Sequence, residues 1–179
     1  MTADIYSFLS NFKGGGARPN RYQVVLDFPK GVGSTETSRK IGFTCKATAI
    51  PSSNMGVIDL PFMGRQIKVP GDKTWDDWNV TVLIDNDFAT RDVFEAWHNK
   101  ILGFQSNVAD KDFIDPANVY AKAQVHQLDR ADKIVKTYFV EGIFPTSVGE
   151  ISLGYDSNDQ VMEQPVTFAI NGWSTSKTS

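Results

Sequence analysis

At 179 residues the chain is long enough for one domain with a substantial core. Its formal net charge of −3 provides no basic face for neutralising phosphates, which excludes a general nucleic-acid-binding protein. The single cysteine, Cys45, excludes an internal disulfide, and no run approaches the roughly 20 apolar residues of a membrane span. The N-terminus lacks the basic and apolar regions of a signal peptide, so we expect the protein to be made and assembled in the cytoplasm.

The first element predicted along the chain is a short amphipathic helix. Ile5, Phe8, Leu9 and Phe12 recur at helical spacing and form one apolar stripe. The glycines at 14–16 end the helix, so we interpret residues 1–16 as an N-terminal helix and a glycine-rich hinge. We expect the stripe to pack on the core of its own domain, with packing on a neighbouring subunit as the alternative.

Several strands follow, separated by polar segments. Residues 22–28 are rich in β-forming side chains and predict a strand, whereas Lys30–Lys40 reads as a polar loop. Apolar and polar residues alternate over 41–48, which predicts a half-buried strand with Cys45 as a buried structural thiol. Pro51–Trp78 reads as a loop with strand-like alternation at 66–69, and a clear strand runs over 78–84.

The clearest helix is predicted over 88–102. Its apolar face consists of Phe94, Trp97, Ile101 and Leu102, with Val93 beside it. Asp87 or Thr90 is expected to cap its start, Arg91 and Glu95 form an i,i+4 pair, and Gly103 marks its end.

The second half of the chain returns to strands. Val119–His126 and Lys133–Phe144 alternate on either side of a charged turn and predict a hairpin. Residues 160–170 predict the last long strand, with Pro165 at an edge or a bulge, and residues 174–179 form a polar, frayed tail. The sequence therefore predicts one mainly β, antiparallel domain over 1–179, with one central α-helix and a short N-terminal helix.

Residue patterns that would support chemistry are absent or broken. His98 and His126 share no motif, and Asp76 and Asp77, if in a strand, point to opposite faces. The segment 156–159 begins like a calcium loop but lacks the required glycine and the bidentate glutamate. We therefore expect no catalytic residues, no cofactor and no metal site.

Several stretches resemble the tail tube protein family of contractile-tailed bacteriophages, in their order and spacing. They are Ala17–Asn20, Phe43–Pro51, Phe62–Ile67, Gly71–Val82, Gly142–Glu150, Asp156–Asn158 and, near the end, Trp173. The resemblance covers nearly the whole chain. Three segments depart from the family pattern, namely the long 30–40 connection, the glycines at 14–16 and the tail from 174.

The resemblance implies a β-sandwich or barrel of the phage tail tube type with a flanking helix. It implies homohexameric rings that stack into a tube in the virion tail, whose lumen conducts the viral genome into the host during ejection. The implied partners are the tail sheath, baseplate and tail terminator proteins. Viral DNA is expected to pass through the lumen without being bound specifically, and the protein is not expected to insert into a membrane. The alternatives are a tube initiator or terminator, a type VI secretion or bacteriocin tube, and a β-sandwich binding module or small enzyme.

Within this scheme we predict which segments carry the assembly. The hairpin from Val119 to Phe144 and the region from Met55 to Val82 are expected to supply the strands of the lumen barrel. A weakly acidic wall suits a DNA conduit because it does not hold phosphates. Polar contacts between rings are expected from Arg65, Asp72, Asp76 and Asp77. The alternative is that glycine, proline and aspartate over 51–78 only shape turns.

Overall fold

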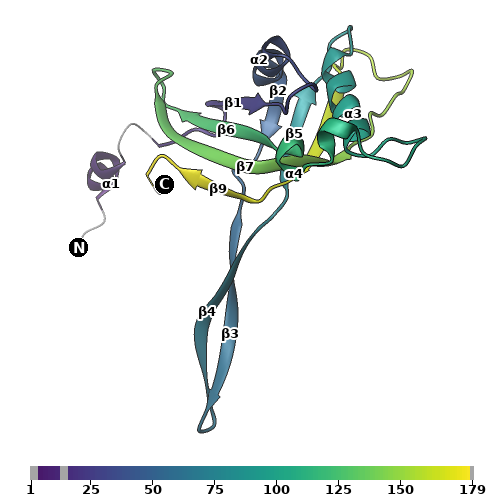
Figure 1. The fold of residues 1–179 in the computed structure, drawn as a ribbon. Helices are drawn as coiled ribbons and strands as arrows, with labels where there is room; N and C mark the ends of the chain where they lie inside the picture. Colours follow the sequence, from purple (N-terminus) through teal and green to yellow (C-terminus); the bar gives the residue numbers. More distant parts are fainter. Residues whose placement is uncertain (1–3, 13–15, 178–179) are drawn as a thin grey trace.

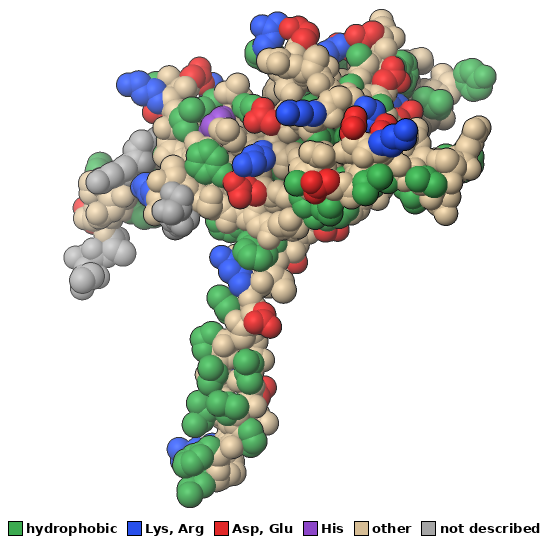
Figure 2. All heavy atoms as spheres, viewed as in Figure 1, with side chains coloured by type: hydrophobic (Ala, Val, Ile, Leu, Met, Phe, Trp, Pro, Cys, Tyr) green, Lys and Arg blue, Asp and Glu red, His purple; other side chains and the backbone are tan. Residues whose placement is uncertain are grey.

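The computed structural model describes residues 4–12 and 16–177 and shows a mainly β domain from which a two-stranded ribbon projects (Figure 1). Hydrophobic side chains lie along the surface of this ribbon (Figure 2). The helices are α1 (Ile5–Asn11), α2 (Thr35–Thr44), α3 (Ala89–Ile101) and α4 (Pro116–Val119), with a 3-10 turn, η2, at Lys111–Phe113. The strands are β1 (Tyr22–Asp27), β2 (Cys45–Thr48), β3 (Ser53–Phe62), β4 (Arg65–Trp75), β5 (Trp78–Leu83), β6 (Ala121–Leu128), β7 (Ile134–Val148), β8 (Glu163–Ala169) and β9 (Gly172–Thr175).

Two antiparallel layers share the long strand β7. Its first part lies between β6 and β9, and its last part pairs with β8. We call the layer β1-β6-β7-β9 sheet A and the layer β2-β5-β8-β7 sheet B. Gly142 lies where β7 passes from one layer to the other, at φ +66°, and a Cβ there would approach the Asn171 side chain to 2.3 Å. Glycine is therefore required at this crossing, since it takes positive φ without a steric cost.

Alternating side chains from both layers build the core. The buried members are Val24, Leu26, Ile41, Trp78, Val80, Val82, Phe94, Trp97, Phe113, Ala121, Ala123, Val125, Val140, Ile143, Val166 and Phe168. The ring of Phe168 lies 5.6 Å from that of Trp78, 6.0 Å from Phe94 and 6.1 Å from Trp97. Trp97 also donates from Nε1 to the Val119 carbonyl at 3.2 Å. This aromatic cluster fixes α3 against the sheets.

The predicted central helix agrees with α3. Its apolar face buries Phe94 and Trp97. The N-cap position is Phe88 rather than Asp87 or Thr90, but the Asp87 carboxylate, one residue earlier, accepts a hydrogen bond from the Ala89 amide at 3.2 Å. Arg91 and Glu95 pair at 2.5 Å. Leu102, predicted on the apolar face, is instead exposed just beyond the last turn.

Helix α2 corrects two predictions. The presumed loop 30–40 contains its first half, and the presumed strand from Ile41 contains its second half, so that β2 starts only at Cys45. Ser34 caps the helix by accepting from the Thr37 amide at 3.2 Å, and this local signal prevails over the alternation at 41–44. The domain therefore has a second helix beside α3. Its Gly42 packs so close to β1 that a Cβ would come within 2.7 Å of the Val24 carbonyl.

The predicted hairpin at 119–144 is confirmed as β6 and β7, with corrected ends. Val119 closes the short helix α4, so β6 begins at Ala121, and β7 continues to Val148. The last long strand starts at Glu163 rather than at 160. The tail predicted to fray from Ser174 instead completes β9, where Thr175 is buried against β7, and residues 178 and 179 lie outside the described residues.

Pro165 is not at an edge, because β8 lies between β7 and β5. The bulge in the β7–β8 pairing falls between Pro145 and Ser147 instead. The Pro165 carbonyl accepts from the Gly149 amide at 2.8 Å, while the buried Gln164 side chain donates from Nε2 to the Gly149 carbonyl at 2.6 Å. In a regular antiparallel pair the amide of residue 165 would make that second bond. The Gln164 side chain thus replaces the donor that proline lacks.

Candidate assembly surface

Side chains that could act in catalysis or bind a metal do not cluster into a site in the described part of the chain. Among the described residues no three His, Cys, Asp or Glu side chains are placed to hold a metal ion, and no helix is long and apolar enough to cross a membrane. Burial raises the pKa of the half-buried Cys45 thiol to about 11, which disfavours the reactive thiolate. His126 contacts the Thr137 hydroxyl at 2.9 Å, and desolvation lowers its pKa. The surfaces that stand out are apolar and exposed.

The largest of these surfaces is the ribbon formed by β3 and β4, which stands off both sheets (Figure 1). The segment 51–78, predicted as a loop, is therefore mostly paired strand, and every residue of β3 is exposed. The pairing sets Ile58 opposite Val69, Leu60 opposite Ile67 and Phe62 opposite Arg65. Because strand side chains alternate between faces, these pairs lie on one side of the ribbon.

The two sides of the ribbon differ in character. We define the ribbon face as Ile58, Leu60, Phe62, Ile67 and Val69, whose side chains are all exposed. The opposite side is mixed: it carries the Asp59–Lys68 and Pro61–Gln66 pairs and, nearer the base, the exposed Val57 opposite Pro70. An amphipathic ribbon that projects from its own domain has an apolar side with nothing to cover it.

The tip of the ribbon is a two-residue turn. Met63 and Gly64 both have positive φ, 44° and 76°, as in the type I′ turns that match strand twist. Met63 is 90% exposed, and Arg65 follows the turn as the first residue of β4. The tip therefore presents a methionine and an arginine at the point farthest from the sheets.

The base of the ribbon is fixed to sheet A by aromatic side chains. Trp173 of β9 donates from Nε1 to the Ser52 carbonyl at 3.3 Å. The Lys73 ammonium lies 5.4 Å from the Trp75 ring centroid and 5.7 Å from that of Trp173, within the range of cation–π attraction. These contacts set the direction in which the ribbon leaves the domain.

Asp76 closes the base from the other side. Its carboxylate accepts from the Ser52 hydroxyl and, at 2.8 Å, from the Asn54 amide. These hydrogen bonds lower the pKa of Asp76, the Ser52 bond most. Because the pKa is lowered in the folded chain, this tie is complete above the carboxyl's ordinary pKa and is lost as the pH falls through the lowered value.

We expect replacement of both Ser52 and Asn54 by alanine to return the pKa of Asp76 toward its ordinary value. Each alanine removes one hydrogen-bond donor to the Asp76 carboxylate. Asp76 is exposed, so in the variant water takes the place of the lost donors. A carboxyl titration followed by NMR measures this shift. An unchanged midpoint would show that the two donors do not control the carboxylate.

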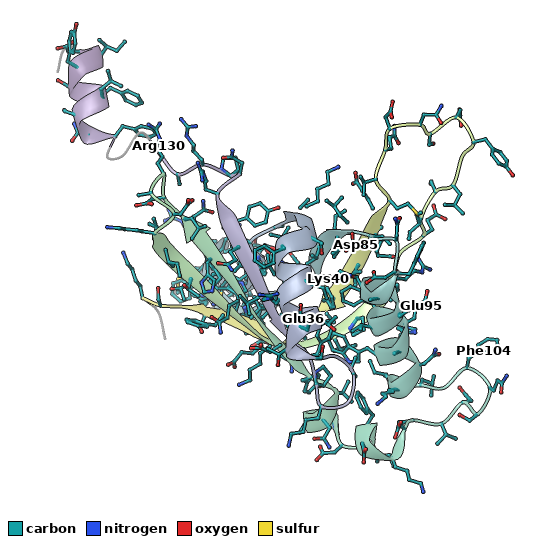
Figure 3. The ribbon with its side chains drawn as sticks, turned by 90° about the horizontal axis from the view of Figure 1, so that it is seen from above. Glu36, Lys40, Asp85, Glu95, Phe104 and Arg130 are labelled. Atoms are coloured by element: carbon teal, nitrogen blue, oxygen red, sulfur yellow. The ribbon has the colours of Figure 1, made fainter. Side chains whose placement is uncertain are left out.

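A second uncovered apolar surface is helix α1. The predicted helix is confirmed, but the expectation that its stripe packs on its own domain core is wrong. Ile5, Phe8, Leu9 and Phe12 are all exposed, and the Phe8 and Phe12 rings stack on each other at 5.5 Å. Seen from above, α1 stands apart from the sheets, close to the β6–β7 turn that carries Arg130 (Figure 3). The predicted hinge residues Gly14 and Gly15 lie outside the described residues.

The structure distributes the predicted contact residues along the ribbon rather than gathering them. Arg65 lies at the tip, Asp72 on β4 nearer the base, and Asp76 and Asp77 in the bend between β4 and β5. Asp76 and Asp77 are therefore not in a strand. The predicted contact residues did not include Trp75, Trp173 or Lys73, although a lysine two residues before a tryptophan was visible in the sequence.

Comparison with known proteins gives consistent matches. A profile described as phage tail tube protein matches residues 17–176. The chain is 36% identical over 158 residues to the tail tube protein gp19 of Enterobacteria phage T4, covering 88% of this chain and 90% of that protein. It is 26% identical to the tail tube protein of Serratia phage KSP90, with 82% of each chain covered.

Solved structures share the fold at low sequence identity. A chain in the baseplate of the anti-feeding prophage superposes with a TM-score of 0.64 at 10% identity, covering 89% of this chain and 95% of that one. A chain in the sheath–tube complex of an extracellular contractile injection system gives 0.62 at 15% identity, covering 97% and 98%. The profile match and the T4 relative together identify the sequence: the chain belongs to the phage tail tube protein family.

Proposed function

We propose that this tail tube protein forms the inner tube of a contractile tail by assembling into six-membered rings that stack. The lumen would conduct the viral genome into the host during ejection. A sheath would surround the tube, and baseplate and terminator proteins would close its ends. As a tail tube protein the chain is a structural component of the virion tail and not an enzyme.

The ribbon is the observation that carries the proposal. Isolated two-stranded hairpins are at best marginally stable in water, and an exposed strand pair with an apolar side invites association. Here such a pair is ten and eleven residues long and projects from the domain. At about 3.3 Å per residue it reaches on the order of 30 Å, enough to lie along an adjacent copy. Assembly with other copies of the chain provides the cover that one copy lacks.

The outer side of sheet A suits a lumen wall. Opposite its buried residues, it carries Gln23, Gln124 and His126, with the half-buried Val25 and Phe139 flanking Gln124. Its charged residues include Lys122 and Glu141, whose Nζ and Oε1 atoms lie 3.8 Å apart across the strand pair. Their opposite charges cancel. A largely polar wall of nearly balanced charge gives phosphates little to bind, so DNA can slide. In this proposal the Val119–Phe144 hairpin lines the lumen.

Sheet A also has the edges needed for closure into a barrel. In the described structure β1 pairs only with β6, and β9 pairs only with β7, so these strands bound the layer. Closing such layers around an axis covers strand edges that would otherwise cause aggregation. The Met55–Val82 region would join the wall through its ribbon, with the Asp59–Lys68 side toward water.

Cryo-electron microscopy of the purified chain tests the proposal. Long hollow tubes built from sixfold rings are expected. Isolated rings that never stack would instead favour a tube initiator or terminator, and persistent monomers would favour a binding module. Either of these two results contradicts the proposed function.

Charge reversal on the ribbon tests its role in stacking. We expect Arg65→Glu or Asp72→Lys to block tube elongation while leaving the fold intact, because both side chains are exposed on the ribbon. Pelleting of tubes and circular dichroism measure the two properties separately. Lys111→Glu, on the exposed turn η2, is the matched control and is expected to elongate normally. Normal elongation of both ribbon variants would remove the polar contacts from the proposal.

A further inference from the structure

We infer that helix α1 of one copy packs on the ribbon face of a second copy, with Asp4 beside Arg65. The inference rests on the proposed function, since it assigns a partner to the ribbon of the assembled tube. It starts from two apolar surfaces of the same chain, neither of which is covered by its own domain.

Both surfaces are exposed to solvent in the separate chain, as a surface that is buried only on assembly must be. Ile5 and Phe8 of α1 are 67% and 64% exposed, and Leu60 and Ile67 of the ribbon face are 49% and 52% exposed. Scattered apolar residues on a surface need no explanation, but contiguous ones indicate an interaction site. An apolar helix stripe against an apolar strand pair is the ordinary way in which helices and sheets bury such sides.

The two surfaces match in length. From Ile5 to Phe12 the helix stripe advances about 10 Å, at about 1.5 Å per residue. From Ile58 to Phe62 the ribbon face extends about 13 Å, at about 3.3 Å per residue. One helix of this size therefore covers most of the length of the ribbon face.

Their charges are also complementary. Arg65 is the charged residue beside the ribbon face, opposite Phe62. Asp4 caps α1, because its carboxylate accepts a hydrogen bond from the Tyr6 amide at 3.3 Å. It lies one residue before Ile5, the first residue of the apolar stripe. When the helix lies with its start toward the ribbon tip, the carboxylate meets the guanidinium. Arginine pairs with carboxylates through two parallel hydrogen bonds, which would fix the direction of the helix.

The contact must form between copies. Within one chain α1 stands beside the β6–β7 turn (Figure 3), whereas the ribbon projects downward from the underside of the domain, away from α1 (Figure 1). The profile shared with other tail tube proteins begins at residue 17, so α1 precedes the matched domain. A helix outside that domain can join two copies without altering the packing of either.

Disulfide trapping tests the contact. Leu9→Cys and Leu60→Cys are made on separate chains that also carry Cys45→Ser, then mixed, assembled and oxidised gently. The expected result is a cross-linked dimer that forms in tubes. Ser10→Cys and Asp59→Cys, on the other sides of helix and ribbon, are the matched controls and should give at least about tenfold less product. Equal yields from both pairs would overturn the inference.

The same experiment distinguishes failure of the two proposals. Tubes that form without the Leu9–Leu60 cross-link contradict the inference alone, whereas a parent chain that forms no tubes contradicts the proposed function. Preferential cross-linking of Leu9→Cys to Val135→Cys would also overturn the inference. It would place α1 in the cavity of about 290 Å³ lined by Ala17, Leu128 and Val135.

A charge swap gives a second test that needs no cysteine. Asp4→Arg alone and Arg65→Asp alone are each expected to block elongation at the parent's critical concentration, raising that concentration at least about tenfold, and the double variant is expected to restore it. Equal losses in the single variants without rescue in the double variant would show that the two residues do not meet. A chain that begins at residue 13 and assembles at the parent's critical concentration would likewise overturn the inference.

Discussion

Replacement of Ile67 by aspartate is expected to abolish tube assembly while the domain keeps its fold. In the separate chain Ile67 is about half exposed on the ribbon face, so a carboxylate there costs the folded subunit little. In the tube the same carboxylate would be buried in an apolar contact, which costs several kcal/mol. Since each 1.4 kcal/mol is a factor of ten, we expect the critical concentration to rise by at least about 100-fold.

The neighbouring residue provides the matched control. Gln66→Asp introduces the same side chain one residue away, on the opposite side of the ribbon. This variant should polymerise within a few-fold of the parent, as measured by light scattering and pelleting. Equal inhibition by both substitutions would mean that the ribbon is sensitive to charge alone, and that its apolar side is not the buried one.

The second large effect is expected in the core, at Trp97. This side chain is fully buried, its ring contacts Phe168 and Phe28, and its Nε1 donates to the Val119 carbonyl. Trp97→Ala removes these contacts and leaves a cavity, so we expect the free energy of unfolding to fall by about 3–5 kcal/mol. Urea unfolding on the Ile67→Asp background measures this in chains that do not polymerise.

Phe104→Ala on the same background is the control, because Phe104 is 92% exposed in the connection after α3 (Figure 3). Its free energy of unfolding should change by less than about 0.5 kcal/mol. A loss below about 1 kcal/mol for Trp97→Ala would contradict the aromatic cluster as the element that holds α3 to the sheets.

The success of the sequence predictions depended on whether a segment packs within its own chain. Trp78–Leu83 alternates in sequence and is alternately buried in the structure, because one side of β5 meets the core. The stripe of α3 was predictable for the same reason. Helix α2 was missed because its start depends on one cap, Ser34, which lies in a segment whose glycines suggested a loop.

The candidate assembly surface was only partly predictable. Alternation over Ile58–Phe62 is visible in the sequence, but alternation normally indicates a strand half-buried in its own sheet. A single sequence does not say that the covering surface belongs to another copy. The stripe of α1 led to the wrong expectation for the same reason, and the base contacts of Trp173 were hidden because they join residues 121 positions apart.

The way in which the ribbon is attached has a mechanical consequence. Both of its strands run from the base to the tip, so a pull on the tip loads two covalent backbones in parallel. The ladder hydrogen bonds lie across this direction and carry little of the load. Tension on the tip would therefore pass along the ribbon into β5 and, through the Trp173–Ser52 hydrogen bond, into β9.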